Sequence, residues 1–88
     1  MKEIKIKCKA EGTGFWLALD KTDIRLVNGE ATHRRNPGVY YLAWWMTGKP
    51  GDSIKIEVTV DGASIGKVET KIPGGEEKAA GVLKLEVK

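Results

Sequence analysis

The chain has 88 residues, of which 41% are hydrophobic and 31% are charged. A chain of this length forms only one hydrophobic core, so we expect a single domain over residues 1–88, and the composition argues against a disordered protein. Fifteen Lys and Arg against 12 Asp and Glu give a net charge of +3, an excess too small to indicate a polyanionic partner. No apolar run approaches the length of a membrane span, so we expect no membrane partner.

Cys8 is the only cysteine, so the chain cannot form an intrachain disulfide. Small secreted domains usually depend on such cross-links. The first residues alternate Lys or Glu with Ile4 and Ile6, which is not the pattern of a signal peptide. These features favour a reducing, cytoplasmic location, and we expect no cofactor.

Apolar and polar residues alternate along the first half of the chain, with turn residues at the spacing of an all-β protein. The strands expected there are Lys2–Lys9, Phe15–Leu19, Ile24–Val27 and Ala31–Arg35. The dipeptide Asn28-Gly29 is typical of a two-residue hairpin turn, so the last two of these strands should pair with each other.

The second half of the chain predicts four more strands, at Val39–Thr47, Ser53–Val60, Ala63–Ile72 and Leu83–Val87. Val39–Thr47 is rich in aromatic residues and should be a central strand, while Ser53–Val60 alternates without a break. A loop should run from Pro73 to near Gly81 and contain at most one helical turn.

Short strands joined by tight turns lack the helical crossovers that parallel sheets require. We therefore expect an all-β fold, an antiparallel two-sheet sandwich of about 7–8 short strands with an immunoglobulin-like arrangement. A small closed barrel of the oligonucleotide-binding type is the alternative.

Few residues of the sequence suit catalysis or metal binding. His33 is the only base that titrates near neutral pH, and Cys8 lies on the apolar side of its strand, where a thiol packs as a small hydrophobe. Four aspartates lie at predicted turns and could bind calcium if they gathered at one end of the sandwich: Asp20, Asp23, Asp52 and Asp61. Asp at such positions usually caps the local backbone instead. We expect no enzyme, no catalytic residue and no metal.

The aromatic segment Val39–Met46 carries the most information about binding, because adjacent strand residues point to opposite faces. Trp44 belongs to the bulkier apolar set and should face the core, which sends Tyr41 and Trp45 outward. Trp16 is outward by the same reasoning. If the two strands share a sheet, Trp16, Tyr41 and Trp45 form a flat aromatic surface suited to a protein partner or a sugar ring.

Two groups of basic residues accompany this pattern. His33, Arg34 and Arg35 end a strand that should be hairpinned to the aromatic one, which is a weak indication of single-stranded nucleic acid. The lysines Lys5, Lys7, Lys9, Lys84 and Lys88 should protect exposed strand edges.

The segment from residue 36 to residue 60 contains Gly38-Val39-Tyr40-Tyr41-Leu42-Ala43-Trp44-Trp45, Thr47-Gly48-Lys49-Pro50-Gly51-Asp52 and Ile54-Lys55-Ile56-Glu57-Val58. This succession resembles the strand, Gly-x-Pro-Gly turn and strand of small bacterial immunoglobulin-like modules of uncharacterised role. The resemblance implies a β-sandwich and brings no catalytic residues.

The sequence therefore predicts a non-catalytic interaction module that binds a protein partner, or forms a homodimer, through an aromatic sheet face or an edge strand. The residues expected to make contact are Trp45, Tyr41, Trp16, His33, Arg34 and Arg35. A carbohydrate or small-ligand module using the exposed rings, and a structural or designed scaffold without a ligand, are the alternatives. A nucleic-acid partner is not expected.

Overall fold

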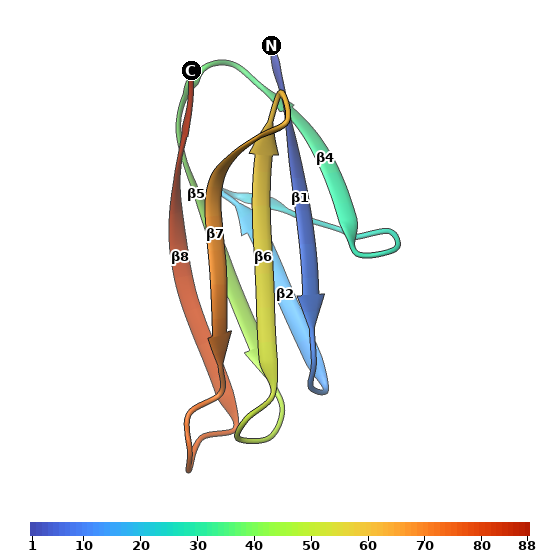
Figure 1. Ribbon diagram of the computed structural model, residues 1–88, viewed down its shortest axis with the longest axis vertical. Helices are drawn as coiled ribbons and strands as arrows, with labels where there is room; N and C mark the ends of the chain where they lie inside the picture. The colour runs from blue at the N-terminus through green and yellow to red at the C-terminus, as the bar shows by residue number, and fades with distance from the viewer.

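The computed structural model describes residues 1–88, and it consists of strands and turns (Figure 1). The strands are β1 (Lys2–Ala10), β2 (Gly14–Leu19), β3 (Thr22–Asp23), β4 (Glu30–Arg35), β5 (Gly38–Thr47), β6 (Ser53–Val60), β7 (Ala63–Lys71) and β8 (Lys78–Val87). The structure contains no helix that is long and apolar enough to span a membrane.

The strands form two four-stranded antiparallel sheets that pack face to face (Figure 1). The first sheet has the order β4-β1-β6-β7 and the second has the order β3-β2-β5-β8. The expected antiparallel two-sheet sandwich is thus confirmed, and each sheet keeps two edges, so the alternative of a closed barrel is wrong. The predicted central strand, Val39–Thr47, lies inside its sheet as β5, and Ser53–Val60 lies inside the other sheet as β6.

The core lies between the sheets and is built by the alternating inward side chains. β6 contributes Ile54, Ile56, Val58 and Val60, as its pattern predicts, and no polar or charged residue is buried. Trp44 on β5 is 7% exposed and lies over Gly81 of β8, its partner in register. A Cβ atom at Gly81 would approach the Trp44 ring to 2.7 Å, so the glycine provides the space that the indole occupies.

The predicted hairpin between Ile24–Val27 and Ala31–Arg35 is wrong. The Asn28-Gly29 turn does form, with positive φ angles of 53° and 79°, but Val27 and Glu30 are joined only by an isolated bridge. The chain crosses from the second sheet to the first at this turn, so β4 pairs with β1 and β3 shrinks to Thr22–Asp23. A favourable turn dipeptide fixes a local reversal without fixing which strands pair beyond it.

The last strand begins earlier than expected. β8 starts at Lys78 and pairs with β5 over ten residues, so the loop that begins near Pro73 ends before Lys78 and not near Gly81. The length of β5 explains the difference, because Thr47 at its end pairs with Lys78. Good helix formers in this segment are outweighed by the open backbone edge of a long aromatic strand.

The expected role of the lysine stripe in edge protection is wrong for β1. Lys5, Lys7 and Lys9 lie on a strand with hydrogen-bonded neighbours on both sides, β4 and β6. Lys84 does lie on an edge strand, β8. A regular apolar-polar alternation shows that one side of a strand is exposed, but it does not distinguish an edge from a centre.

Candidate functional site

The outer surface of the second sheet carries a group of exposed aromatic and aliphatic side chains, which we call the aromatic face. It is formed by outward residues of β2, β5 and β8: Trp16, Val39, Tyr41, Ala43, Trp45, Ala80 and Val82. Trp16, Tyr41 and Trp45 are 45%, 49% and 41% exposed. The predicted orientations of Trp44 and Trp45, and the placement of Trp16 in the same sheet, agree with the structure.

Trp16 and Trp45 lie directly opposite each other on β2 and β5. Opposed residues in an antiparallel pair have Cβ atoms only ~4.5–5.5 Å apart, so the two side chains leave the sheet from neighbouring positions. Trp16 Nε1 donates a hydrogen bond of 3.1 Å to Asp23 Oδ1 on β3, which turns this ring toward the edge of the sheet. Trp16 therefore extends the aromatic face toward β3.

Small residues lie next to the two tryptophans on the outer side of the sheet. Ala18 points outward from β2 opposite Ala43, yet it is only 3% exposed. Asp20 binds the backbone of Tyr41 through two hydrogen bonds. Its backbone N–H donates to the Tyr41 carbonyl at 2.8 Å, and its Oδ1 accepts from the Tyr41 N–H at 3.0 Å. The backbone under Tyr41 is thus anchored at both polar groups.

The basic residues predicted to join this site are elsewhere. His33, Arg34 and Arg35 lie on β4, an edge strand of the first sheet, while the aromatic strand β5 belongs to the second. The expectation that these two strands form a hairpin is wrong. His33 and Arg35 share the inward side of β4 with Ala31, and Arg34 is exposed on the opposite side. Burial, and then the nearby Arg35 charge, lower the pKa of His33.

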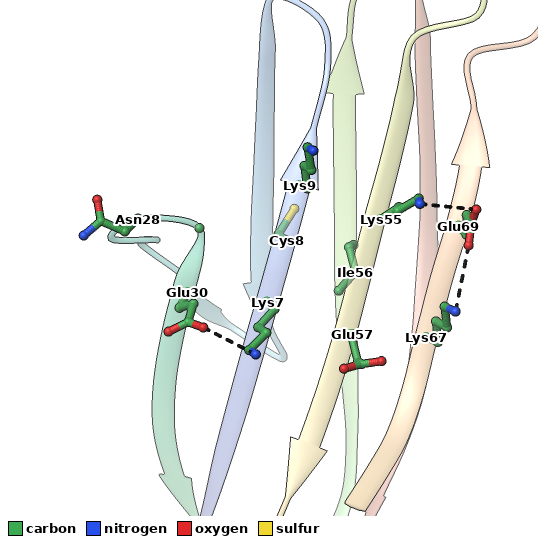
Figure 2. Close-up of a pocket in the computed structure, with 11 residues that line it drawn as sticks. Lys7, Cys8, Lys9, Asn28, Glu30, Lys55, Ile56, Glu57, Lys67 and Glu69 are labelled. Atoms are coloured by element: carbon green, nitrogen blue, oxygen red, sulfur yellow. Dashed lines mark ion pairs between the residues drawn. The ribbon is translucent and has the colours of Figure 1, made fainter. Parts of the chain in front are cut away.

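The outer surface of the first sheet is charged, and we call it the charged face. A shallow depression of about 610 Å³ crosses it between β4, β1, β6 and β7 (Figure 2). Its rim is held by ion pairs, with Lys7 and Glu30 3.6 Å apart and Glu69 within 4 Å of both Lys55 and Lys67. These ion pairs neutralise part of the charge that lines the depression.

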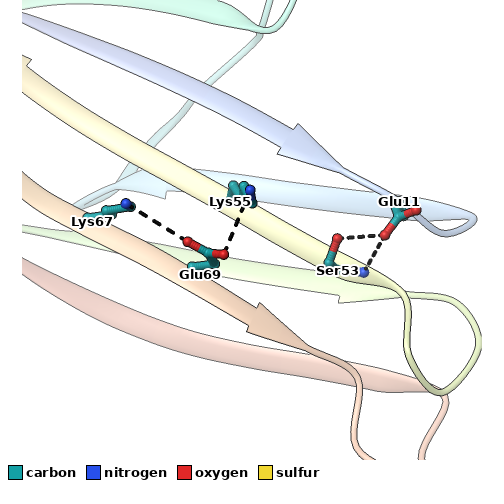
Figure 3. A network of polar contacts seen from close by, with 5 residues as sticks. All are labelled: Glu11, Ser53, Lys55, Lys67 and Glu69. Carbon is teal, nitrogen blue, oxygen red and sulfur yellow. Dashed lines mark hydrogen bonds and ion pairs between the residues drawn. The ribbon is translucent and has the colours of Figure 1, made fainter.

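A second polar cluster lies at the end of the same sheet, where Glu11 meets the start of β6 (Figure 3). Glu11 Oε1 accepts hydrogen bonds from both the backbone N–H and the hydroxyl of Ser53. These two bonds lower the pKa of the Glu11 carboxyl. The Glu11 N–H also donates to the Ser53 carbonyl. These contacts fasten the start of the turn between β1 and β2 to the first residue of β6.

The residues considered for catalysis do not meet. Cys8 and His33 lie on neighbouring strands, but His33 pairs with Ile4, four residues along β1 from Cys8 and so ~13 Å away. Burial raises the pKa of the Cys8 thiol to about 11, which keeps it protonated at neutral pH.

The turn aspartates each have a local contact. Asp20 and Asp23 bind Tyr41 and Trp16 as described above, Asp52 Oδ2 accepts from the Lys49 N–H at 2.9 Å, and Asp61 pairs with Lys2 at 3.0 Å. Nowhere do three or more His, Cys, Asp or Glu side chains gather in the geometry of a metal site.

Sequence reasoning missed the contribution of β8 to the aromatic face. Ala80 and Val82 are exposed, Val82 at 67%, and they lie beside Trp45 and Ala43. The alternation of Lys78, Ala80, Val82 and Lys84 on one side of a strand was the available signal. The helix formers that precede Gly81, and the prediction of a loop as far as this residue, hide that signal.

Comparison of the chain with protein-family models, with curated proteins and with solved structures finds no match.

Proposed function

We propose that the protein is a non-catalytic interaction module that binds an apolar patch of another protein through the aromatic face. The observation that carries the proposal is the pair of neighbouring, half-exposed indoles of Trp16 and Trp45, bordered by exposed Val39, Tyr41 and Val82. Trp and Tyr dominate the energetic centres of protein interfaces because they supply a large contact area at a small loss of rotamer entropy.

The surroundings of the rings favour a protein over a carbohydrate. A sugar site needs several polar groups that orient the hydroxyls. Here the Trp16 N–H is already bound to Asp23, and the neighbours of Trp45 on β8 and β5 are the methyl groups of Ala80 and Ala43. Apolar neighbours with Lys84 and Glu86 at the margin resemble the apolar centre and polar rim of a protein interface.

The size of the aromatic face indicates a weak, reversible contact. With ten residues in β5 and strands ~4.8 Å apart, three strands span about 500 Å². Stable complexes bury ~800 Å² per partner, and surfaces below that size are typical of transient encounters. We therefore expect a dissociation constant in the micromolar range or weaker.

Other parts of the molecule support the remaining elements of the proposal. Burial of the Cys8 thiol and its separation from His33 support a non-catalytic role. The distance in the fold between the basic residues of β4 and the aromatic rings removes the main reason to consider nucleic acid. The immunoglobulin-like arrangement remains our prediction for the detailed class of the sandwich.

Photo-crosslinking from the aromatic face tests the proposal. Benzoylphenylalanine replaces Trp45 in one variant and Glu57, an exposed residue of the charged face, in a matched control. Both are irradiated in cells that express them. We expect an adduct with a discrete protein from position 45 and none of that mass from position 57.

The captured protein is then purified and titrated with the wild type, Trp45→Ala and Glu57→Ala by calorimetry. Trp45→Ala should weaken binding about tenfold or more, as truncation of a central interface residue does, while Glu57→Ala should leave it unchanged. The proposal fails if both positions give the same adducts, or if Trp45→Ala binds as tightly as the wild type. A glycan that binds the wild type and not Trp45→Ala would replace the protein by a carbohydrate.

A further inference from the structure

The two sheets have four edge strands, and three of them are short or irregular. β3 has two residues and β4 has six. β7 is longer, but its pairing with β6 shifts register beside Val58 and Thr59. Shortness and bulges are among the features by which edge strands avoid pairing with other chains.

β8 differs from the other three edges. It is ten residues long and pairs with β5 from Lys78 to Val87 without a register shift. Its central residues, Ala79 to Leu83, are five consecutive uncharged residues without proline. In Figure 1, β8 lies at the margin of the molecule beside β7. β7 lies close to β8, where Gly66 approaches the side chains of Leu83 and Leu85, but it belongs to the other sheet and forms no strand pairing with β8.

We propose that β8 of one copy pairs antiparallel with β8 of a second copy, with Val82 on the two-fold axis. A two-fold axis perpendicular to the sheet sets even-numbered residues opposite even-numbered residues. With Val82 on the axis, Lys78 of each copy lies opposite Glu86 of the other, and both are exposed. Two opposite-charge pairs then flank an apolar centre, and such cross-strand pairs stabilise a sheet.

The neighbouring registers lack this complementarity. A shift of two residues places Lys78 opposite Lys84 of the second copy in one direction and opposite Lys88 in the other. Like charges directly opposite each other destabilise a pair of strands. The charges of β8 therefore select one register among those that keep the outward side chains on the same side.

This pairing has a consequence for the surface above it. The second sheets of the two copies join into one continuous sheet of eight strands, and the two aromatic faces lie on the same side of it. The dimer would thus present two adjoining apolar surfaces to a partner. The inference does not rest on the proposed function, because it depends on β8 alone.

Sedimentation equilibrium of the wild type, Glu86→Lys, the double variant Lys78→Glu/Glu86→Lys and Glu57→Lys tests the inference, at about 10 μM to 1 mM protein, the range of transient contacts. Glu86→Lys makes both flanking pairs like-charged and should weaken dimerisation about tenfold or more. The double variant reverses both charges and should restore the dimer. Glu57→Lys changes the net charge by the same amount on the charged face and should dimerise as the wild type does.

Trp45→Lys separates this dimer from self-association through the aromatic face. We expect this variant to dimerise with the affinity of the wild type. The inference is overturned if the wild type is monomeric throughout, if Glu86→Lys dimerises as the wild type does, if the double variant does not recover, or if Trp45→Lys abolishes the dimer. The crosslinking result from position 45 does not bear on any of these outcomes, so the two proposals fail separately.

Discussion

The two outer surfaces of this sandwich cover the same core but differ in composition. On the charged face, alternating Lys and Glu side chains form a surface of ion pairs, including Lys7 with Glu30 and Lys55 with Glu69. On the aromatic face, the equivalent outward positions hold Trp16, Tyr41 and Trp45. Packing of the core between the sheets does not determine which side chains point outward. The difference is the basis of our proposal that the aromatic face binds a partner.

The largest effect should come from the two sides of β5. Trp44 is buried and Trp45 is 41% exposed, although they are adjacent in sequence. Trp44→Ala should lower the free energy of unfolding by ~3–5 kcal/mol, as expected for a large ring removed from a core. Trp45→Ala should lower it by only about 1 kcal/mol, because Trp45 is partly exposed and contributes mainly as a cross-strand partner of Trp16.

Guanidinium unfolding followed by far-ultraviolet circular dichroism measures both variants without relying on tryptophan emission. Similar losses for Trp44→Ala and Trp45→Ala would show that the aromatic face is part of the folding core, and the contrast between the two outer surfaces would lose its meaning.

The support beneath the aromatic face can be tested at Gly81. The Trp44 ring occupies the space that a side chain would need there, so Gly81→Ala should cost ~1–3 kcal/mol through overpacking. Gly74→Ala is the matched control, because a Cβ atom at Gly74 has no neighbour within 4 Å. Thermal unfolding of both variants provides the measurement, and equal melting temperatures would contradict the close contact between Gly81 and Trp44.

Quenching of tryptophan emission by acrylamide sharpens the comparison without altering stability much. Trp45→Phe removes an exposed indole and should lower the quenching constant, whereas Trp44→Phe removes the protected indole and should raise it. Trp16, at 45% exposure, should remain quenchable in both variants. Emission that is equally protected in all three proteins would mean that the aromatic face is covered in solution.

The smallest effect should come from the polar cluster beside the charged face. Hydrogen bonds from Ser53 lower the pKa of Glu11 from its usual 4.5, so the folded state favours the ionised carboxylate. Its stabilising contribution is therefore present above pH 4.5 and is lost as the pH falls through the lowered pKa. The melting temperature of the wild type should exceed that of Glu11→Gln at neutral pH, and the gap should close on acidification. A gap that persists at low pH would contradict an ionic origin.

Much of the fold could be predicted from the sequence because local rules agree with the final structure over most of the chain. Alternation in Ser53–Val60 gave both the strand and its buried side, and the bulk of Trp44 relative to its neighbours gave the orientation of β5. The orientation of Trp16, Tyr41 and Trp45 followed from the same period of two.

Pairing between distant segments could not be predicted in the same way. The residues around Asn28-Gly29 do not show that β4 pairs with β1 and not with the segment before the turn. This pairing places the basic residues of β4 in the sheet that lacks the aromatic face. Ala79 and Ala80 have a high helix propensity. They form a strand because they pair with Met46 and Trp45, and the neighbouring sequence does not reveal this pairing. The missing parts of the candidate site are those that tertiary contacts decide.

The central position of β1 determines when this protein can complete its fold during synthesis. β1 pairs with β4 on one side and with β6 on the other, so its second partner arrives only when the sixth strand has left the ribosome. At ~5–20 residues per second, Ile4 waits roughly 3–11 s for Val60. Throughout that time β1 has at most one hydrogen-bonded neighbour, and its apolar side chains Ile4, Ile6 and Cys8 lack most of the core that later buries them, which makes this the kind of segment that chaperones bind. Cellular yield should therefore depend on how well this strand is shielded early, more than on the stability of the finished sandwich.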